Sequence, residues 1–302
     1  MKKILTGNQA VARGVYEAGV HFASAYPGTP STEILENIGT YKEIVAEWAP
    51  NEKVALEAVI GASIAGGRSL AAMKHVGVNV AADPLFTFAY TGVNGGSVLI
   101  TADEPGMHSS QNEQDNRNYA KFAKIPMFEP SNSQESKDMV KYAFDFSEKF
   151  NSIVLFRMTT RVCHSKGSVT LGERVEVPIK KYEKDFDKYV AVPAIGRKLR
   201  HKVEERLNLL KEYSETSKWN YKVDNKSKIG VIASGMSYEY TWEALGETVD
   251  YLKLGFTYPL PRTLIDEFCE SHDTVYIIEE NDPIIEEFTR DRKSTRLNSS
   301  HG

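Results

Sequence analysis

The sequence predicts an α/β protein with a doubly wound, mostly parallel sheet and a partial second α/β domain. Three observations lead to this prediction. Short apolar runs alternate with helical patterns up to residue 165, which is the spacing of βαβ units. Residues 166–227 are rich in charge and contain one long helical pattern. A second alternation of strand and helix patterns begins at residue 229.

The first domain is expected to span residues 1–165, and its strands are predicted where apolar runs stop at turn residues. An amphipathic helix around 10–18 should precede the first of them. We predict strands over residues 22–25, 44–48, 70–75, 97–102, 125–128 and 152–158. The helices between them are predicted from residue 33 and over residues 54–65, 77–90 and 133–150. Pro84 should either kink its helix or mark the true helix start.

The rest of the chain divides into three further segments. We expect residues 166–227 to form a linker arm and a bridging helix, the helix covering 196–216. Residues 228–288 should form a small second α/β domain, cut short. Residues 289–302 are polar and basic without a period, and they look like the translation of a sequencing adapter. We therefore exclude them from fold reasoning.

Composition excludes several classes of function. The 302 residues carry a formal net charge of -4. A net negative charge does not favour binding to nucleic acid or to an anionic membrane. No apolar run is long enough to span a bilayer, and no signal peptide is recognisable. We therefore expect a cytoplasmic protein. Cys163 and Cys269 lie far apart without a CxxC spacing, so we expect no metal site in this chain.

The stretch after the first predicted strand is the strongest turn signal. Residues 26–31 read YPGTPS, and two prolines with a glycine cannot continue a strand ladder. Ser31 or Thr32 should cap the following helix. An open α/β sheet presents groups to a ligand through this order of elements, in which a strand is followed by a rigid turn and then by the start of a helix. A tight βα turn without any chemistry is the competing interpretation.

Two further features sit where a strand is expected to end. Glu52 begins a helix of small residues, and its carboxylate either satisfies the helix dipole or points into a site. Residues 103–115 form a long polar loop, which indicates substrate or cofactor contacts, or else a solvated surface loop. Gly7 and Gly14 have the wrong spacing for a dinucleotide fingerprint, and no strong strand precedes them.

Several motifs together resemble the 2-oxoacid:ferredoxin oxidoreductases, and within them the alpha subunits of the indolepyruvate type. They are GNQAVARG at 7–14, YPGTPSTE at 26–33, PGMHSSQNEQDNR at 105–117, TTRVCHS at 159–165 and IEEN at 278–281. The resemblance covers nearly all of residues 1–288. It implies that the first domain binds the pyrimidine half of thiamine diphosphate and that 228–288 is like the C-terminal domain of transketolase.

The resemblance also implies roles for individual residues. Glu52 would face the cofactor pyrimidine and promote the imino tautomer, which then deprotonates the thiazolium carbon. Thr29 would lie near the reacting carbonyl, so we expect Glu52 and Thr29 to be catalytic. Cofactor binding is expected of Glu52 and the turn residues Tyr26, Pro27, Gly28 and Thr29. Substrate contacts are expected, on weaker grounds, from His108, Ser109, Ser110 and Asn112.

The chain also departs from the family pattern. It lacks the Gly-Asp-Gly type motif that holds the diphosphate with Mg²⁺, and the cysteine-rich module that holds iron–sulfur clusters. We therefore expect it to be the amino-terminal part of a longer subunit, inactive alone and sharing thiamine diphosphate with a missing domain. The resemblance implies a beta subunit and ferredoxin as partners, and an arylpyruvate and coenzyme A as substrates. A sister enzyme for pyruvate, oxoglutarate or branched-chain oxoacids, and a non-catalytic assembly fragment, are the alternatives.

Overall fold

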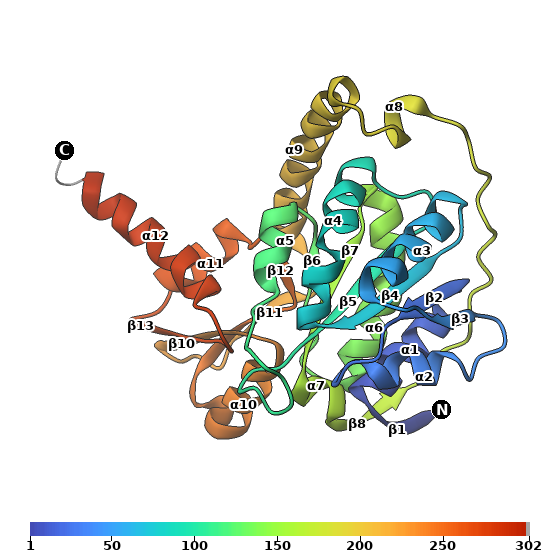
Figure 1. The fold of residues 1–302 in the computed structure, drawn as a ribbon. Coiled ribbons are helices and arrows are strands. Elements are labelled where there is room, and N and C mark those ends of the chain that lie inside the picture. Colours follow the sequence, from blue (N-terminus) through green and yellow to red (C-terminus); the bar gives the residue numbers. More distant parts are fainter. Residues whose placement is uncertain (300–302) are drawn as a thin grey trace.

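The computed structural model describes residues 1–299, which contain three sheets (Figure 1). The largest has seven strands in the order β12-β6-β7-β5-β4-β2-β3. All neighbours pair in parallel except β12, which is antiparallel to β6. The strands are β2 (Phe22–Ala25), β3 (Val45–Trp48), β4 (Ser69–Lys74), β5 (Ser97–Asp103), β6 (Met127–Phe128), β7 (Val154–Thr159) and β12 (Phe256–Tyr258). The predicted mostly parallel sheet is thus confirmed.

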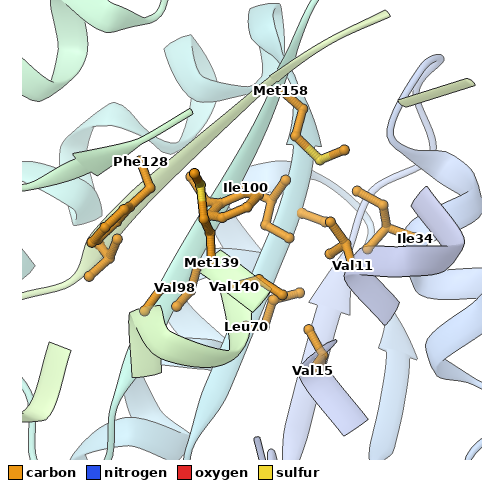
Figure 2. Close-up of a cluster of buried hydrophobic side chains, with 14 of the residues drawn as sticks. Val11, Val15, Ile34, Leu70, Val98, Ile100, Phe128, Met139, Val140 and Met158 are labelled. Carbon is orange, nitrogen blue, oxygen red and sulfur yellow. The ribbon is translucent and has the colours of Figure 1, made fainter. Parts of the chain in front are cut away.

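Helices cover both faces of this sheet, as the doubly wound prediction requires. One face carries α1 (Gly7–Glu17), α2 (Thr32–Ile38) and α6 (Ser133–Phe150). The other face carries α3 (Glu52–Ile64), α4 (His75–Thr91) and α5 (Arg117–Ala123). Successive side chains of β4 point to opposite faces of the sheet. Leu70 packs in the hydrophobic cluster under α1, α2 and α6, and Ala71 packs in the cluster under α3, α4 and α5. Figure 2 shows the first cluster, where Met139 and Val140 of α6 gather near Ile100 of β5.

A strand that the sequence patterns did not predict opens the chain. β1 (Lys2–Thr6) pairs antiparallel with β8 (Lys166–Thr170) in a sheet of its own. Its side chains are mostly exposed, so it lacks the apolar run that marks a buried strand. Thr6 and Gln9 then cap α1 through a reciprocal capping box. The expectation that no strong strand precedes Gly7 is corrected, although β1 lies outside the parallel sheet.

Helix α4 begins earlier than the sequence indicated. β4 ends at Lys74, and His75, which we had placed in the strand, is the first helical residue. Pro84 lies inside the helix, so the alternative of a helix that starts at Pro84 is wrong. His75 and Val78 are fully buried. Their burial packs the helical turns that precede Pro84 against the sheet.

The segment after β8 runs along the outside of the first domain before it reaches a long helix (Figure 1). Backbone bonds join Val175 to Glu17 at 3.1 Å and Lys180 to Gly66 at 3.0 Å. The short helix α7 (Thr160–His164) precedes β8, and the segment after β8 contains α8 (Phe186–Tyr189) and α9 (Pro193–Thr216). The long helix predicted at 196–216 is therefore present and begins three residues earlier.

A second α/β unit follows, as predicted, around a four-stranded sheet in the order β13-β10-β11-β9. β10 pairs in parallel with β11 and β13, and β9 is antiparallel. Its elements are β9 (Asn220–Val223), β10 (Ile229–Ser234), α10 (Gly235–Leu245), η1 (Gly246–Thr248), β11 (Asp250–Leu254), α11 (Arg262–Glu270), β13 (Thr274–Ile278) and α12 (Ile284–Ser299). β12 follows β11 in the chain but pairs with β6 at the edge of the seven-stranded sheet. Sequence patterns did not indicate this pairing.

Helix α12 continues to Ser299, through most of the segment 289–302 that was excluded from the fold prediction. The rest of that segment, residues 300–302, lies outside the described residues. None of the helices within residues 1–299 combines the length and the apolar character that crossing a bilayer requires.

Candidate functional site

The turn after β2 is held by its own hydrogen bonds. The amide of Gly28 donates to the hydroxyl of Thr32 at 2.8 Å, and the hydroxyl of Ser31 donates to the carbonyl of Gly28 at 2.9 Å. Asn8 donates to the carbonyl of Pro30 at 2.8 Å and anchors the turn to α1. Thr29 itself is exposed. The predicted rigid turn is therefore present, with Thr29 free to meet a ligand.

Glu52 is the first residue of α3, immediately after the N-cap Asn51, which accepts from the amide of Val54 at 3.0 Å. Its carboxylate lies against Gly77, in the first turn of α4. A methyl group at Gly77 would come within 2.6 Å of Glu52 Oε1, so the absence of a side chain there makes room for the carboxylate. Within the described residues, the Glu52 carboxylate has no hydrogen bond or salt bridge.

Lys74 contacts the turn and directly precedes the helix that faces Glu52. It is the last residue of β4 and the N-cap of α4, three residues before Gly77. Its methylene groups also pack under the turn, with Cδ 3.3 Å from the place a Cβ would take on Gly28. The carboxyl ends of β2, β3 and β4 are neighbours in the sheet. Lys74 thus lies beside the turn at Gly28 and directly precedes the helix turn that carries Gly77.

The loop after β5 folds around Glu104, while residues 106–109 and 111–113 remain exposed to solvent. Glu104 accepts from the amide of Ser109 at 2.8 Å, from the Ser109 hydroxyl at 3.0 Å and from the Ser110 hydroxyl. Burial would raise the pKa of Glu104, but the hydrogen bonds from Ser110 and Ser109 outweigh it and the pKa is lowered. The carbonyl of Asn112 lies 3.1 Å from His75 Nε2. These expected substrate contacts therefore also shape the loop.

His108 lies apart from the Glu104 cluster. It lines a cavity of about 340 Å³ together with Thr160, Arg161, His164 and Ser165. Two of the sequence motifs, 105–117 and 159–165, meet in this cavity. Nothing in the geometry joins His108 to Thr29 or Glu52, and its substrate contact stays a prediction.

A buried charge network supports the loop from below. Arg157 of β7 is fully enclosed and donates to Asp103 at 2.7 Å and to Glu129. Its Nη2 lies 3.7 Å from Asp115. Burial raises the pKa of Asp103, although Arg157 opposes the effect. One cation thus faces three carboxylates that arise at the ends of β5 and β6 and in the loop.

Arg117 extends the network to the second α/β unit. It pairs with Asp115 and donates to Glu279 at 2.6 Å, and to the carbonyls of Glu280 at 2.7 Å and Asp282 at 2.8 Å. The motifs at 105–117 and 278–281 are therefore in direct contact. This contact gives the IEEN segment a structural role, which is to hold the loop in place.

Sequence reasoning missed Lys74, Gly77 and Arg157. Lys74 and Arg157 stand at or within apolar runs that were read as strands, and Gly77 was read as an ordinary helix residue. The signal that could have found them is charge inside a buried strand, since a buried Lys or Arg needs a partner.

No metal site is evident within the described part of the chain, where no group of three or more His, Cys, Asp or Glu side chains could hold an ion. Cys163 carries a free, buried thiol. Burial raises the pKa of the Cys163 thiol, which makes it a poor nucleophile.

Comparisons with known proteins are consistent with this arrangement. Residues 13–204 match the family described as pyruvate flavodoxin/ferredoxin oxidoreductase, thiamine-diphosphate-binding. The chain is 46% identical over 297 residues to the indolepyruvate oxidoreductase subunit IorA of Archaeoglobus fulgidus, covering 94% of this chain and 48% of that protein. It is 44% identical over 301 residues to the same subunit of Pyrococcus horikoshii, covering 95% of this chain and 46% of that protein. The chain thus spans about half the length of these relatives.

More distant similarities extend to other substrates. The 2-oxoglutarate synthase subunit KorA of Methanocaldococcus jannaschii is 28% identical over 186 residues, or 58% of this chain and 50% of that protein. A solved 2-oxoglutarate:ferredoxin oxidoreductase from Magnetococcus marinus, with 2-oxoglutarate, coenzyme A and succinyl-CoA bound, aligns with a TM-score of 0.75. That alignment covers 96% of this chain and 60% of the other at 19% identity, so it shows the fold alone.

Proposed function

The chain belongs to the pyruvate flavodoxin/ferredoxin oxidoreductase family with a thiamine-diphosphate-binding domain, and on that premise we propose that it serves an indolepyruvate oxidoreductase. In this proposal it is the pyrimidine-binding part of an alpha subunit. The assembled enzyme decarboxylates an arylpyruvate oxidatively, transfers the acyl group to coenzyme A and reduces ferredoxin. The identity of 44–46% to indolepyruvate oxidoreductase subunits supports this substrate class.

The observation that carries the proposal is the unpartnered carboxylate of Glu52 in the space left by Gly77. A carboxyl group at this place can share a proton with a ring nitrogen of the aminopyrimidine of thiamine diphosphate. When bound, the cofactor supplies a thiazolium carbon that can add to a 2-oxo group. Glu52 holds the proton that sets the tautomer of the aminopyrimidine, which is general acid–base work.

The turn after β2 has a positioning role in the same proposal. Tyr26, Pro27 and Gly28 would line the side of the site that holds the cofactor. Thr29 presents its exposed hydroxyl as a donor to the carbonyl oxygen of the substrate. The bonds from Gly28 to Thr32 and from Asn8 to Pro30 fix this hydroxyl before the substrate arrives.

Other components of the reaction are assigned to parts outside this chain. The diphosphate with Mg²⁺, the iron–sulfur clusters and the beta subunit lie elsewhere in the proposed enzyme. The cytoplasm is the proposed location, which suits the free thiol of Cys163. We propose that this chain alone lacks activity, since it offers residues for one half of the cofactor only.

A sister enzyme for 2-oxoglutarate is the second candidate function. It is favoured by the match to KorA, but only at 28% identity over 58% of the chain. The arylpyruvate proposal rests on the higher identity over a longer span.

The proposal is tested by purifying the assembled enzyme and following reduction of ferredoxin by absorbance with coenzyme A present. Indolepyruvate and phenylpyruvate should support turnover, with kcat/KM at least tenfold above that for pyruvate or 2-oxoglutarate. Leaving out coenzyme A is the control. Faster turnover of 2-oxoglutarate would replace the arylpyruvate assignment with the second candidate, and no turnover of any 2-oxo acid would refute the enzyme assignment.

A further inference from the structure

Lys74 is a charged side chain of the candidate site that the chemistry above does not use. It ends β4, which lies between β2 and β5 in the middle of the sheet. Only 13% of its side chain is exposed. A lysine so far removed from water normally has a carboxylate or several carbonyls around its ammonium group.

The partners of this ammonium group are incomplete. Its nearest carboxylate oxygen is Glu104 Oε2 at 3.9 Å, and within the described residues it has no hydrogen bond. Glu104 already accepts three hydrogen bonds from Ser109 and Ser110. The carboxylate that faces Lys74 is therefore largely satisfied by the loop, and all three donor hydrogens of the ammonium remain for another acceptor.

The position of Lys74 relative to the other site residues indicates what that acceptor is. Its stem packs under Gly28, the residue before Thr29. Its helix carries Gly77, against which Glu52 lies. In a 2-oxo acid the carboxylate is bonded directly to the carbonyl carbon, so a substrate whose carbonyl reaches Thr29 brings its carboxylate to the neighbouring groups.

We propose that Lys74 binds the carboxylate of the 2-oxo acid substrate, and that Glu104 is the positioning residue that keeps the ammonium group between the turn and the loop. The inference rests on the proposed function, because it takes the substrate to be a 2-oxo acid. Lys74 makes the site selective for acids over the corresponding aldehydes, which have the same side chain and carbonyl without the charge.

The test compares K74M, K74R and wild type in the assembled enzyme. Methionine keeps the unbranched stem that packs under Gly28 and removes only the charge. K74M should raise KM for indolepyruvate about 10- to 100-fold, the range for a charged hydrogen bond, and leave KM for indoleacetaldehyde within about twofold. K74R should recover most of the loss. K198M, which removes a lysine of α9 that pairs with Asp187 of α8, is the matched control.

A binding measurement gives a readout that does not depend on turnover. In calorimetry, wild type should bind indolepropionate at least tenfold more tightly than the neutral indolepropionamide, and K74M should bind the two alike. Equal losses for acid and aldehyde in K74M, or unchanged preference for the carboxylate, would overturn the inference. A wild type that turns over neither acid nor aldehyde would refute the proposed function instead, and the binding comparison would still decide the role of Lys74.

Discussion

Replacing Gly77 by alanine should separate the stability of the fold from the chemistry of Glu52. The new methyl group would lie 2.6 Å from Glu52 Oε1 and 2.7 Å from its Cγ. An ordinary contact needs about 3.5 Å, so the carboxylate has to move by about 1 Å. A misplacement of that size costs about 100-fold in rate.

The fold itself should tolerate this change. The atoms that must move all belong to the single side chain of Glu52, and alanine is favoured over glycine in a helix by about 1 kcal/mol. Gly77 lies in α4 without a positive φ. We therefore expect G77A to unfold within about 1 kcal/mol of wild type.

The assay is the rate at which the thiazolium C2 proton of bound thiamine diphosphate exchanges with deuterium, read by NMR after acid quench. G77A should slow this exchange about 100-fold in the assembled enzyme. G61A is the matched control, because a methyl group at Gly61 of α3 meets no atom within 4 Å and should stabilise the helix without altering exchange. Wild-type exchange in G77A, or a loss of more than about 2 kcal/mol in stability, would refute the reasoning.

Three further predictions concern single side chains of the site and its support. E52Q should slow the same proton exchange by a factor of about 100 to 10,000 and leave thermal unfolding unchanged, and normal exchange would exclude the role of Glu52. R157M should lower the free energy of unfolding by about 3–5 kcal/mol in urea titrations, because Asp103 and Glu129 lose their buried cation. R200M, which breaks an exposed pair with Glu204, should cost less than about 1 kcal/mol, and equal losses would contradict the burial argument. Because the pKa of Glu104 lies below its usual value, its stabilising contribution is present above pH about 4.5 and is lost as pH falls through the folded-state pKa. S110A should therefore be about 1–2 kcal/mol less stable than wild type at pH 7. The difference should shrink as the pH falls through the folded-state pKa of Glu104, and a difference that stays constant on acidification would show that the hydroxyl acts without the carboxylate.

The elements that sequence patterns predicted are those with strong local signals. The buried strands at 97–102 and 152–158 and the amphipathic helix at 133–150 follow from apolar period alone. The turn at 26–31 follows from its prolines and glycine. β1 and β8 could not be predicted in this way, because each is exposed and forms only by pairing with a partner about 160 residues away.

The candidate site was predictable only in part, for a related reason. Glu52 and Thr29 were identified through the resemblance, and the chain order says nothing of how they meet. Lys74 and Gly77 become relevant only once β4 is known to lie beside β2. Arg157 depends on partners from a loop and two other strand ends. Such contacts are set by sheet order, which residue periodicity does not contain.

Because β12 belongs to the seven-stranded sheet, truncating the chain between the two α/β units does not yield two complete domains. Phe256 of β12 is fully enclosed and meets Phe128 of β6 edge to face at 5.0 Å. A gene fragment ending at residue 165 lacks Phe256, so it would uncover the ring of Phe128 and leave β6 as an unpaired edge strand. Such an edge invites association with other molecules. Any attempt to express the amino-terminal part by itself should therefore carry the chain past Tyr258.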